Sequence, residues 1–218
     1  MIVVIGLPAY VDSPDGERCA GGLAVEVASA AQRRGSTVEL VGKVGNDGAG
    51  DAVVVALGRF GIGHAALLRD PILPTPVLAT SPGSDDGAEV DAEGPLARLL
   101  PESADSRPGL EAADVELALR FLPAANVVVV ADAMSEATTA AGVEGAAFSA
   151  AKLVVLVPAG AMPPAVPAEA TVLEAPLDDD GSFGRLVGAF AGALDAGVDA
   201  ATAFSEAVKA AGWEPAAE

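Results

Sequence analysis

The chain has 218 residues, of which 51% are hydrophobic, and its mean hydropathy of +0.44 excludes a disordered linker or tail. Thirty-one acidic residues against 12 basic ones give a net charge of −19, which repels nucleic-acid backbones and anionic membrane surfaces. The single cysteine, Cys19, excludes an intramolecular disulfide framework. We therefore expect neither nucleic acid nor a membrane as a partner.

Short apolar runs alternate along the chain with longer amphipathic segments. The predicted strands are residues 2–5, 38–41, 127–130, 153–157 and 171–173. The predicted helices are residues 23–34, 50–60, 111–122, 135–150, 182–194 and 199–211. Strands with so few polar residues are typical of a sheet that helices cover on both faces. The pattern predicts an α/β fold with a doubly wound, mostly parallel sheet.

Residues 71–108 break this pattern, because they are rich in proline, glycine, serine and acidic residues. Extended stretches are predicted at 76–80 and near 88–91. We expect this segment to form a small lid or flap outside the main sheet, within a single domain that spans residues 1–218. Exposed strand edges in such a lid favour pairing between copies, so we also expect a homodimer through the lid.

The apolar runs are too short for a membrane helix, which needs about 18 residues. The first residues, Met1–Gly6, carry no basic region and no cleavage site. These features favour a cytoplasmic location.

The most distinctive stretch is residues 38–51, a strand followed by a glycine-rich turn and a helix. A helix N-terminus in this setting can hold an anion. However, the glycine spacing does not give the G-x-G-x-x-G pattern of dinucleotide sites, and no P-loop motif occurs. Asp47 and Asp51 would also repel phosphate. A Rossmann-type site is therefore excluded.

Together with Gly21, Gly22 and residues 57–62, this stretch resembles the first half of the ribokinase/pfkB family of carbohydrate kinases. The resemblance covers residues 1 to about 80, and a weaker resemblance extends from about residue 127 to 212. It implies a ribokinase-like fold and sugar or nucleoside substrates, with Thr75 at the position of a lid threonine. It further implies that Asp12, Gly21 and Gly22 hold substrate hydroxyls.

Glu26 stands where the family has an asparagine. An ionised glutamate only accepts hydrogen bonds, so it would change the substrate preference. The alternative is that Glu26 is a surface residue of an amphipathic helix.

The family's catalytic motif, D-x-x-G-A-G-D at a helix N-terminus, corresponds to residues 178–184. In the family the backbone N–H groups of this motif hold developing negative charge, and its last aspartate takes the proton of the acceptor hydroxyl. The remnant of this anion hole consists of Gly181, Ser182, Phe183 and Gly184. Gly184 offers no general base, and Phe183 replaces a glycine that lets phosphate approach the backbone. The run of aspartates at 178–180 adds charge of the wrong sign and is read as a solvated turn rather than a metal site.

Two further family motifs, N-x-x-E for the metal and T-x-G-x-x-G for the nucleotide, have no counterpart. Residues 153–160 pass through a proline-rich bridge at 162–167 almost directly into 171–173. A strand-helix section is thus skipped, which would remove most of the ATP pocket. We expect no catalytic residue, no metal site and no cofactor, with ATP and Mg²⁺ required only by the kinase alternative.

The remaining candidates favour structural roles. His64 lies in a loop, Cys19 next to the glycine pair is assigned to packing, and Trp213 is expected to anchor the C-terminal helix to the core. The leading hypothesis is a degenerate carbohydrate-kinase-like protein that binds a sugar, nucleoside, similar small molecule or protein partner without phosphoryl transfer. The alternatives are an active ATP-dependent carbohydrate kinase and a structural or assembly partner.

Overall fold

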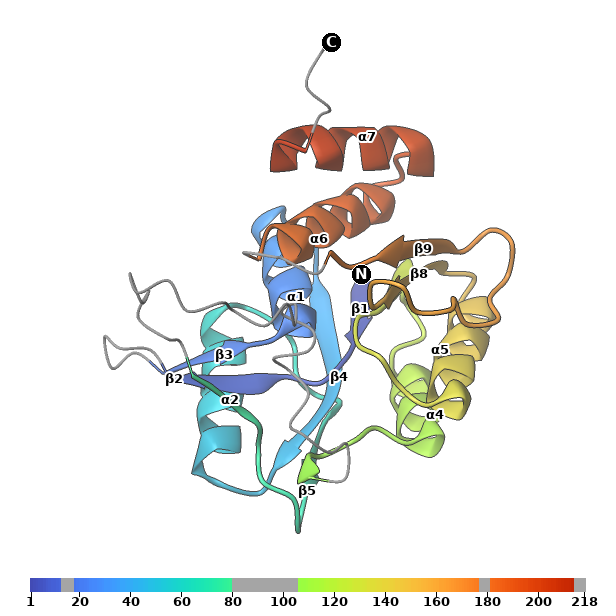
Figure 1. Cartoon of the computed structure of the whole chain (residues 1–218). Helices are drawn as coiled ribbons and strands as arrows, with labels where there is room; N and C mark the ends of the chain where they lie inside the picture. Colours follow the sequence, from blue (N-terminus) through green and yellow to red (C-terminus); the bar gives the residue numbers. More distant parts are fainter. Residues whose placement is uncertain (13–17, 80–105, 177–180, 214–218) are drawn as a thin grey trace.

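The computed structural model describes residues 1–12, 18–79, 106–176 and 181–213 (Figure 1). The main sheet has six strands in the order β5-β4-β1-β7-β8-β9, and every neighbouring pair is parallel. The strands are β1 (Ile2–Ile5), β4 (Val38–Gly45), β5 (Leu67–Asp70), β7 (Val127–Val130), β8 (Lys152–Val157) and β9 (Thr171–Glu174). The strand order reverses between β1 and β7. The predicted doubly wound α/β fold is confirmed.

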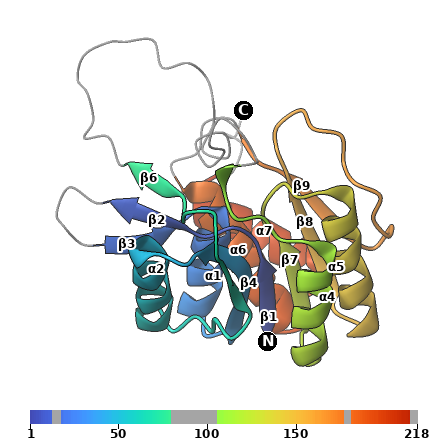
Figure 2. The ribbon, with the colours of Figure 1, turned by 90° about the horizontal axis from the view of Figure 1, so that it is seen from below.

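Helices cover both faces of this sheet (Figures 1 and 2). They are α1 (Leu23–Arg33), α2 (Gly48–Arg59), α4 (Ala112–Phe121), α5 (Glu136–Phe148), α6 (Ser182–Asp195) and α7 (Ala200–Ala211). In β1, Ile2 and Val4 pack in the core shared with α1, α2 and α6, whereas Val3 and Ile5 pack against α4 and α5. This two-sided burial explains why the central strands β1 and β7 are apolar at every position.

Helix α7 covers α6 rather than the sheet (Figure 1). Phe190 of α6 and Phe204 of α7 meet edge to face, with ring centroids 5.8 Å apart. Ala203 and Ala207 are buried on the inner side of α7. Among the described residues, no helix is long and apolar enough to span a bilayer.

A second, three-stranded sheet lies beside the main one (Figure 2). It consists of β3 (Arg18–Gly21), β2 (Ala9–Asp12) and β6 (Val77–Ala79), with β2 antiparallel to β3 and parallel to β6. Strand β6 matches the stretch predicted at 76–80 and lies outside the main sheet, as expected. The stretch predicted near 88–91, with most of the 71–108 flap, lies outside the described residues. The sequence did not predict β2, β3 or β5.

Two of the boundaries that differ from those predicted lie in the glycine-rich segment. Strand β4 continues to Gly45, so Gly42 and Gly45 belong to the strand and not to the turn after it. A Cβ at Gly42 would lie 2.7 Å from the carbonyl oxygen of Gly6, which explains why glycine occupies this strand position. Helix α2 begins at Gly48, two residues earlier than predicted, because Asp47 caps it.

Helices α1 and α6 pack very closely along a line of small residues. Gly184, Gly188 and Gly192 are spaced four apart on α6, so they share one face of that helix. A Cβ at Gly188 would lie 2.5 Å from both the Ala30 Cβ and the Val27 carbonyl oxygen. The missing side chains bring the first turns of the two helices together at the carboxyl end of the sheet.

Candidate functional site at the carboxyl edge of the sheet

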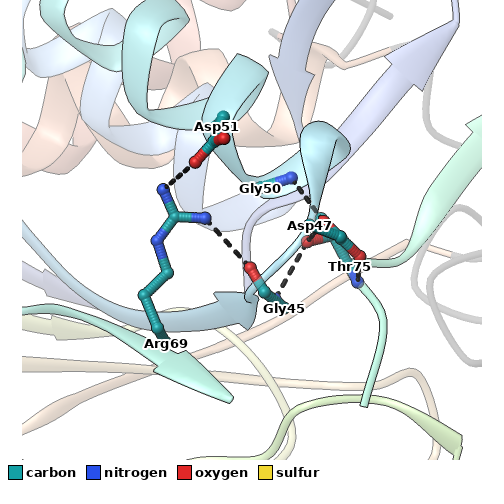
Figure 3. A network of polar contacts seen from close by, with 6 residues as sticks. All are labelled: Gly45, Asp47, Gly50, Asp51, Arg69 and Thr75. Atoms are coloured by element: carbon teal, nitrogen blue, oxygen red, sulfur yellow. Dashed lines mark hydrogen bonds and ion pairs between the residues drawn. The ribbon is translucent and has the colours of Figure 1, made fainter. Parts of the chain in front are cut away.

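The glycine-rich segment after β4 forms a hydrogen-bonded network around Asp47 (Figure 3). The Oδ1 atom of Asp47 accepts a hydrogen bond from the Gly50 N–H at 2.7 Å. The Thr75 hydroxyl donates to Oδ1 at 2.7 Å, and the Thr75 N–H donates to Oδ2 at 2.8 Å. Burial raises the pKa of Asp47, but hydrogen bonds from Gly50 and Thr75 and the charge of Arg69 lower it overall.

The same network reaches β5. The Gly45 N–H donates to Thr75 Oγ1 at 2.9 Å, and Arg69 donates to the Gly45 carbonyl oxygen at 2.9 Å (Figure 3). Arg69 also pairs with the exposed Asp51, an ion pair that contributes little in water. The network ties the end of β4 to the segment that leads into β6. It also places a carboxylate of the chain at the positive end of α2, which agrees with the exclusion of a phosphate cradle there.

We expect Thr75→Val to destabilise the protein by about 1–3 kcal/mol, because it leaves the buried N–H of Gly45 without its acceptor. Thr75 is only 3% exposed, so water does not replace the lost hydroxyl. Urea unfolding measures the change. The control is Thr37→Val at an exposed position, which should cost less than about 0.5 kcal/mol. Equal losses in the two variants would show that the network is not stabilising.

The glycine pair expected to hold substrate hydroxyls has a local structural role. Gly22 is the N-cap of α1 with φ of 99°, a conformation that favours glycine. A Cβ at Gly21 would overlap the Cγ2 of Val11 on the neighbouring strand. Both glycines are therefore explained by the turn and the packing at the start of α1. Asp12 ends β2, and its side chain lies outside the described part.

The start of α6 holds the residues of the predicted anion-hole remnant, from the N-cap Gly181 through Ser182 and Phe183 to Gly184. A Cβ at Gly184 would lie 2.6 Å from the Cβ of Glu26 and 2.7 Å from its Oε2. A Cβ at Gly181 would lie 3.6 Å from the same oxygen. The half-buried Glu26 of α1 thus fills the space into which a side chain at position 184 would extend.

Phe183 is a core residue of this first turn. It is 3% exposed, and its ring stacks on Trp213 with centroids 6.3 Å apart. Trp213 itself is 41% exposed, so it is an anchor at the rim of the core rather than inside it. The run at 178–180 lies outside the described residues.

Asp132 is the site residue that the sequence analysis missed. It lies two residues after the end of β7, is 7% exposed, and accepts a hydrogen bond from the Leu7 N–H after β1 at 2.6 Å. Burial raises the pKa of Asp132 to about 6, although the Leu7 hydrogen bond and the charge of Arg107 oppose the rise. The feature that could have identified Asp132 is a polar residue at the carboxyl end of a buried parallel strand, next to the point where the strand order reverses.

The first turn of α1 lies between these groups. The Cβ position of Gly6 is 2.5 Å from both Ala24 Cβ and Asp132 Oδ2, while Glu26 on the same turn meets the start of α6. We call Glu26, Asp132 and residues 181–184 the carboxyl-edge site. Ligands bind at this place in open α/β sheets. In the part of the chain that the structure covers, no group of three or more potential metal ligands occurs.

The remaining predicted positions are not brought to this site. His64 lies in the loop between α2 and β5, and its Nδ1 is 3.2 Å from the carbonyl oxygen of Ile62. The side chain of Cys19 on β3 lies outside the described part. Residues 158–170, all of which the structure describes, connect β8 to β9 without a helix.

No protein-family model matches the sequence, and no curated protein matches it either. Solved structures do match. An uncharacterized sugar kinase from Pyrococcus horikoshii is 17% identical with a TM-score of 0.54, over 72% of this chain and 55% of that chain. A PfkB protein from a Polaromonas species is 15% identical with a TM-score of 0.55, over 71% of this chain and 54% of that one. Ribokinase from Arabidopsis thaliana, solved with ribose and ATP, is 16% identical with a TM-score of 0.63. The match covers 96% of this chain and 90% of that chain.

The chain therefore spans about half the length of the first two proteins. At such low identities the likeness concerns the arrangement of the backbone. The parallel sheet, the helices on its two faces and the small second sheet together place this chain in the ribokinase/PfkB-like fold.

Proposed function

We propose that the protein binds a small molecule at the carboxyl-edge site and does not transfer phosphoryl groups. One observation carries the proposal: position 184 has no side chain, and Glu26 fills the space that a side chain there would need. The family resemblance assigns the general base of phosphoryl transfer to this position. Losing a general base typically lowers the rate by about a hundred- to ten-thousandfold.

The residues present do not fit a nucleotide phosphate at this end of the sheet. Phosphate binding uses exposed N–H groups and positive charge at a helix N-terminus. Here the carboxylates of Glu26 and Asp132 lie at the same edge of the sheet, and both repel an anion when ionised. The helix-free connection at 158–170 also supports the proposal, because the family's motifs for the metal and the nucleotide were expected in a section that this connection replaces.

The test is a coupled ADP-release assay on the wild type and on Gly184→Asp, with ATP, Mg²⁺ and a panel of pentoses, hexoses and nucleosides. We expect no turnover from either protein. Gly184→Asp should also lower the melting temperature, because the new Cβ would lie 2.6 Å from Glu26 Cβ. Wild-type turnover in the kinase range of about 1–100 per second would overturn the proposal.

A thermal-shift screen with the same compounds tests the binding role. A ligand at 100 times its dissociation constant raises the free energy of unfolding by about 2.7 kcal/mol. Stabilisation by a sugar or nucleoside without ATP supports a binding protein. If no compound raises the melting temperature, the result would favour the alternative of a structural or assembly partner. The predicted homodimer would then be the first property to measure.

One observation favours a second candidate, an ATP-dependent carbohydrate kinase. The Oε2 atom of Glu26 is 2.7 Å from the Cβ position of residue 184, about as far as an aspartate's own carboxyl oxygens lie from its Cβ. Glu26 would then act as the general base in place of residue 184. In that case the wild type releases ADP, and Glu26→Gln loses about a hundred- to ten-thousandfold in rate.

A further inference from the structure

The first turn of α6, all of whose residues the structure describes, receives its negative charge from another helix. A helix N-terminus carries a partial positive charge that a side-chain cap or an acidic residue in the first turn usually balances. The N-cap Gly181 has no side-chain oxygen that could accept a hydrogen bond from the first turn, and residues 182–184 include no acidic side chain. The Oε2 atom of Glu26 lies within 4 Å of the Cβ positions of both Gly181 and Gly184.

The packing of α1 holds this carboxylate in place. Leu23 and Val27 flank Glu26 on α1 and are buried at 5% and 0% exposure. The glycines at 181 and 184 leave the room that the Glu26 side chain occupies. A cation is also nearby, because Arg185 Nη1 lies 3.3 Å from the Cβ position of Gly181. The arrangement is that of a filled anion position.

We propose that Glu26 is the specificity-determining residue of the carboxyl-edge site, because its carboxylate occupies the anion position at the start of α6 and excludes phosphate groups. This inference rests on the proposed binding function and narrows its ligand. Ionised Glu26 and Asp132 only accept hydrogen bonds. The site therefore takes neutral or cationic ligands that donate hydrogen bonds from hydroxyl or amino groups, and rejects their phosphorylated forms.

The experiment measures the binding of inorganic phosphate to the wild type, Glu26→Gln and Glu26→Ala. Titrations use phosphorus NMR line broadening and thermal shift, with ionic strength held constant by sodium chloride. Glu26→Gln keeps the volume of the side chain and removes its charge, so it preserves the packing against α6 if Glu26→Ala does not fold. We expect weak or undetectable binding to the wild type and at least tenfold tighter, saturable binding to both variants.

The control is Glu206→Gln on the exposed side of α7, which removes the same charge away from the site. It should bind phosphate as the wild type does. The inference is overturned if Glu26→Gln gains no affinity for phosphate, if the wild type already binds phosphate as tightly, or if Glu206→Gln gains as much. The ADP-release assay on the wild type tests the proposed function separately, because its result does not depend on the phosphate affinity of the variants.

Discussion

Asp132→Asn is expected to make the protein more stable at pH 7, by up to about 3 kcal/mol. The carboxyl group of Asp132 is buried at the carboxyl end of β7, and burial raises its pKa from 3.8 to about 6. Each tenfold change in proton affinity corresponds to about 1.4 kcal/mol, which sets the upper limit. Asparagine keeps an oxygen that can accept the hydrogen bond from Leu7 but carries no charge to bury.

The sign of the pH dependence follows from the direction of this pKa shift. Between about pH 4 and 6 the folded state holds a proton on Asp132 that the unfolded state has already released. The stability of the wild type therefore falls as the pH rises through this window, and stays at the lower level above it. Near pH 4 the folded state carries the proton and the unfolded state still carries it about half of the time, so little of the stability difference has developed and the wild type and Asp132→Asn should be similarly stable there.

Urea unfolding of both proteins at several pH values from 4 to 8 measures this effect as the difference between them. Glu206→Gln serves as the control, because it removes one charge from an exposed position on α7. A constant difference across the pH range, or a variant less stable at pH 7, would contradict the assignment. A carboxylate that reduces stability in this way is typical of a functional site rather than of a folding determinant.

Most strands of the main sheet could be predicted, because short apolar runs indicate strands that are buried on both faces. The runs at 2–5 and 127–130 contain no polar residue, and both faces of these strands lie under helices. Strands β2, β3 and β5 were missed because they mix polar with apolar side chains, whereas β1 and β7, which are equally short, are wholly apolar. The pairing of β5 with β4 and of β2 with β6 also joins segments that are distant in sequence, which local periodicity does not contain.

The candidate site was predicted in part. The glycine pair, Glu26 and the start of α6 were named because they correspond to local motifs of the ribokinase/pfkB family, which this sequence resembles. Asp132 leaves no such pattern, since a single aspartate after a strand is common in sequences. The contact between Glu26 and the start of α6 was also not predictable, because it depends on how closely two helices from opposite ends of the chain pack.

Gly188→Ala is expected to destabilise the protein by about 2–3 kcal/mol, because α1 leaves no room for a methyl group. A Cβ at Gly188 would lie 2.5 Å from Ala30 Cβ, 2.5 Å from the Val27 carbonyl oxygen and 3.0 Å from the Ala31 nitrogen. Two of these three atoms belong to the backbone of α1, so the clash can be removed only if one helix moves. Alanine favours a helix over glycine by about 1 kcal/mol, and the strain must exceed this gain.

Gly48→Ala in the first turn of α2 is the matched control, because a Cβ there meets nothing within 4 Å. That variant should be neutral or stabilised by up to about 1 kcal/mol, so the two substitutions are expected to act in opposite directions. Since Glu26 reaches the start of α6 across the same helix pair, Gly188→Ala should also weaken the exclusion of phosphate. Urea unfolding that gives both alanine variants the same stability would mean that the two helices can separate without cost, and that nothing in their packing holds Glu26 in place.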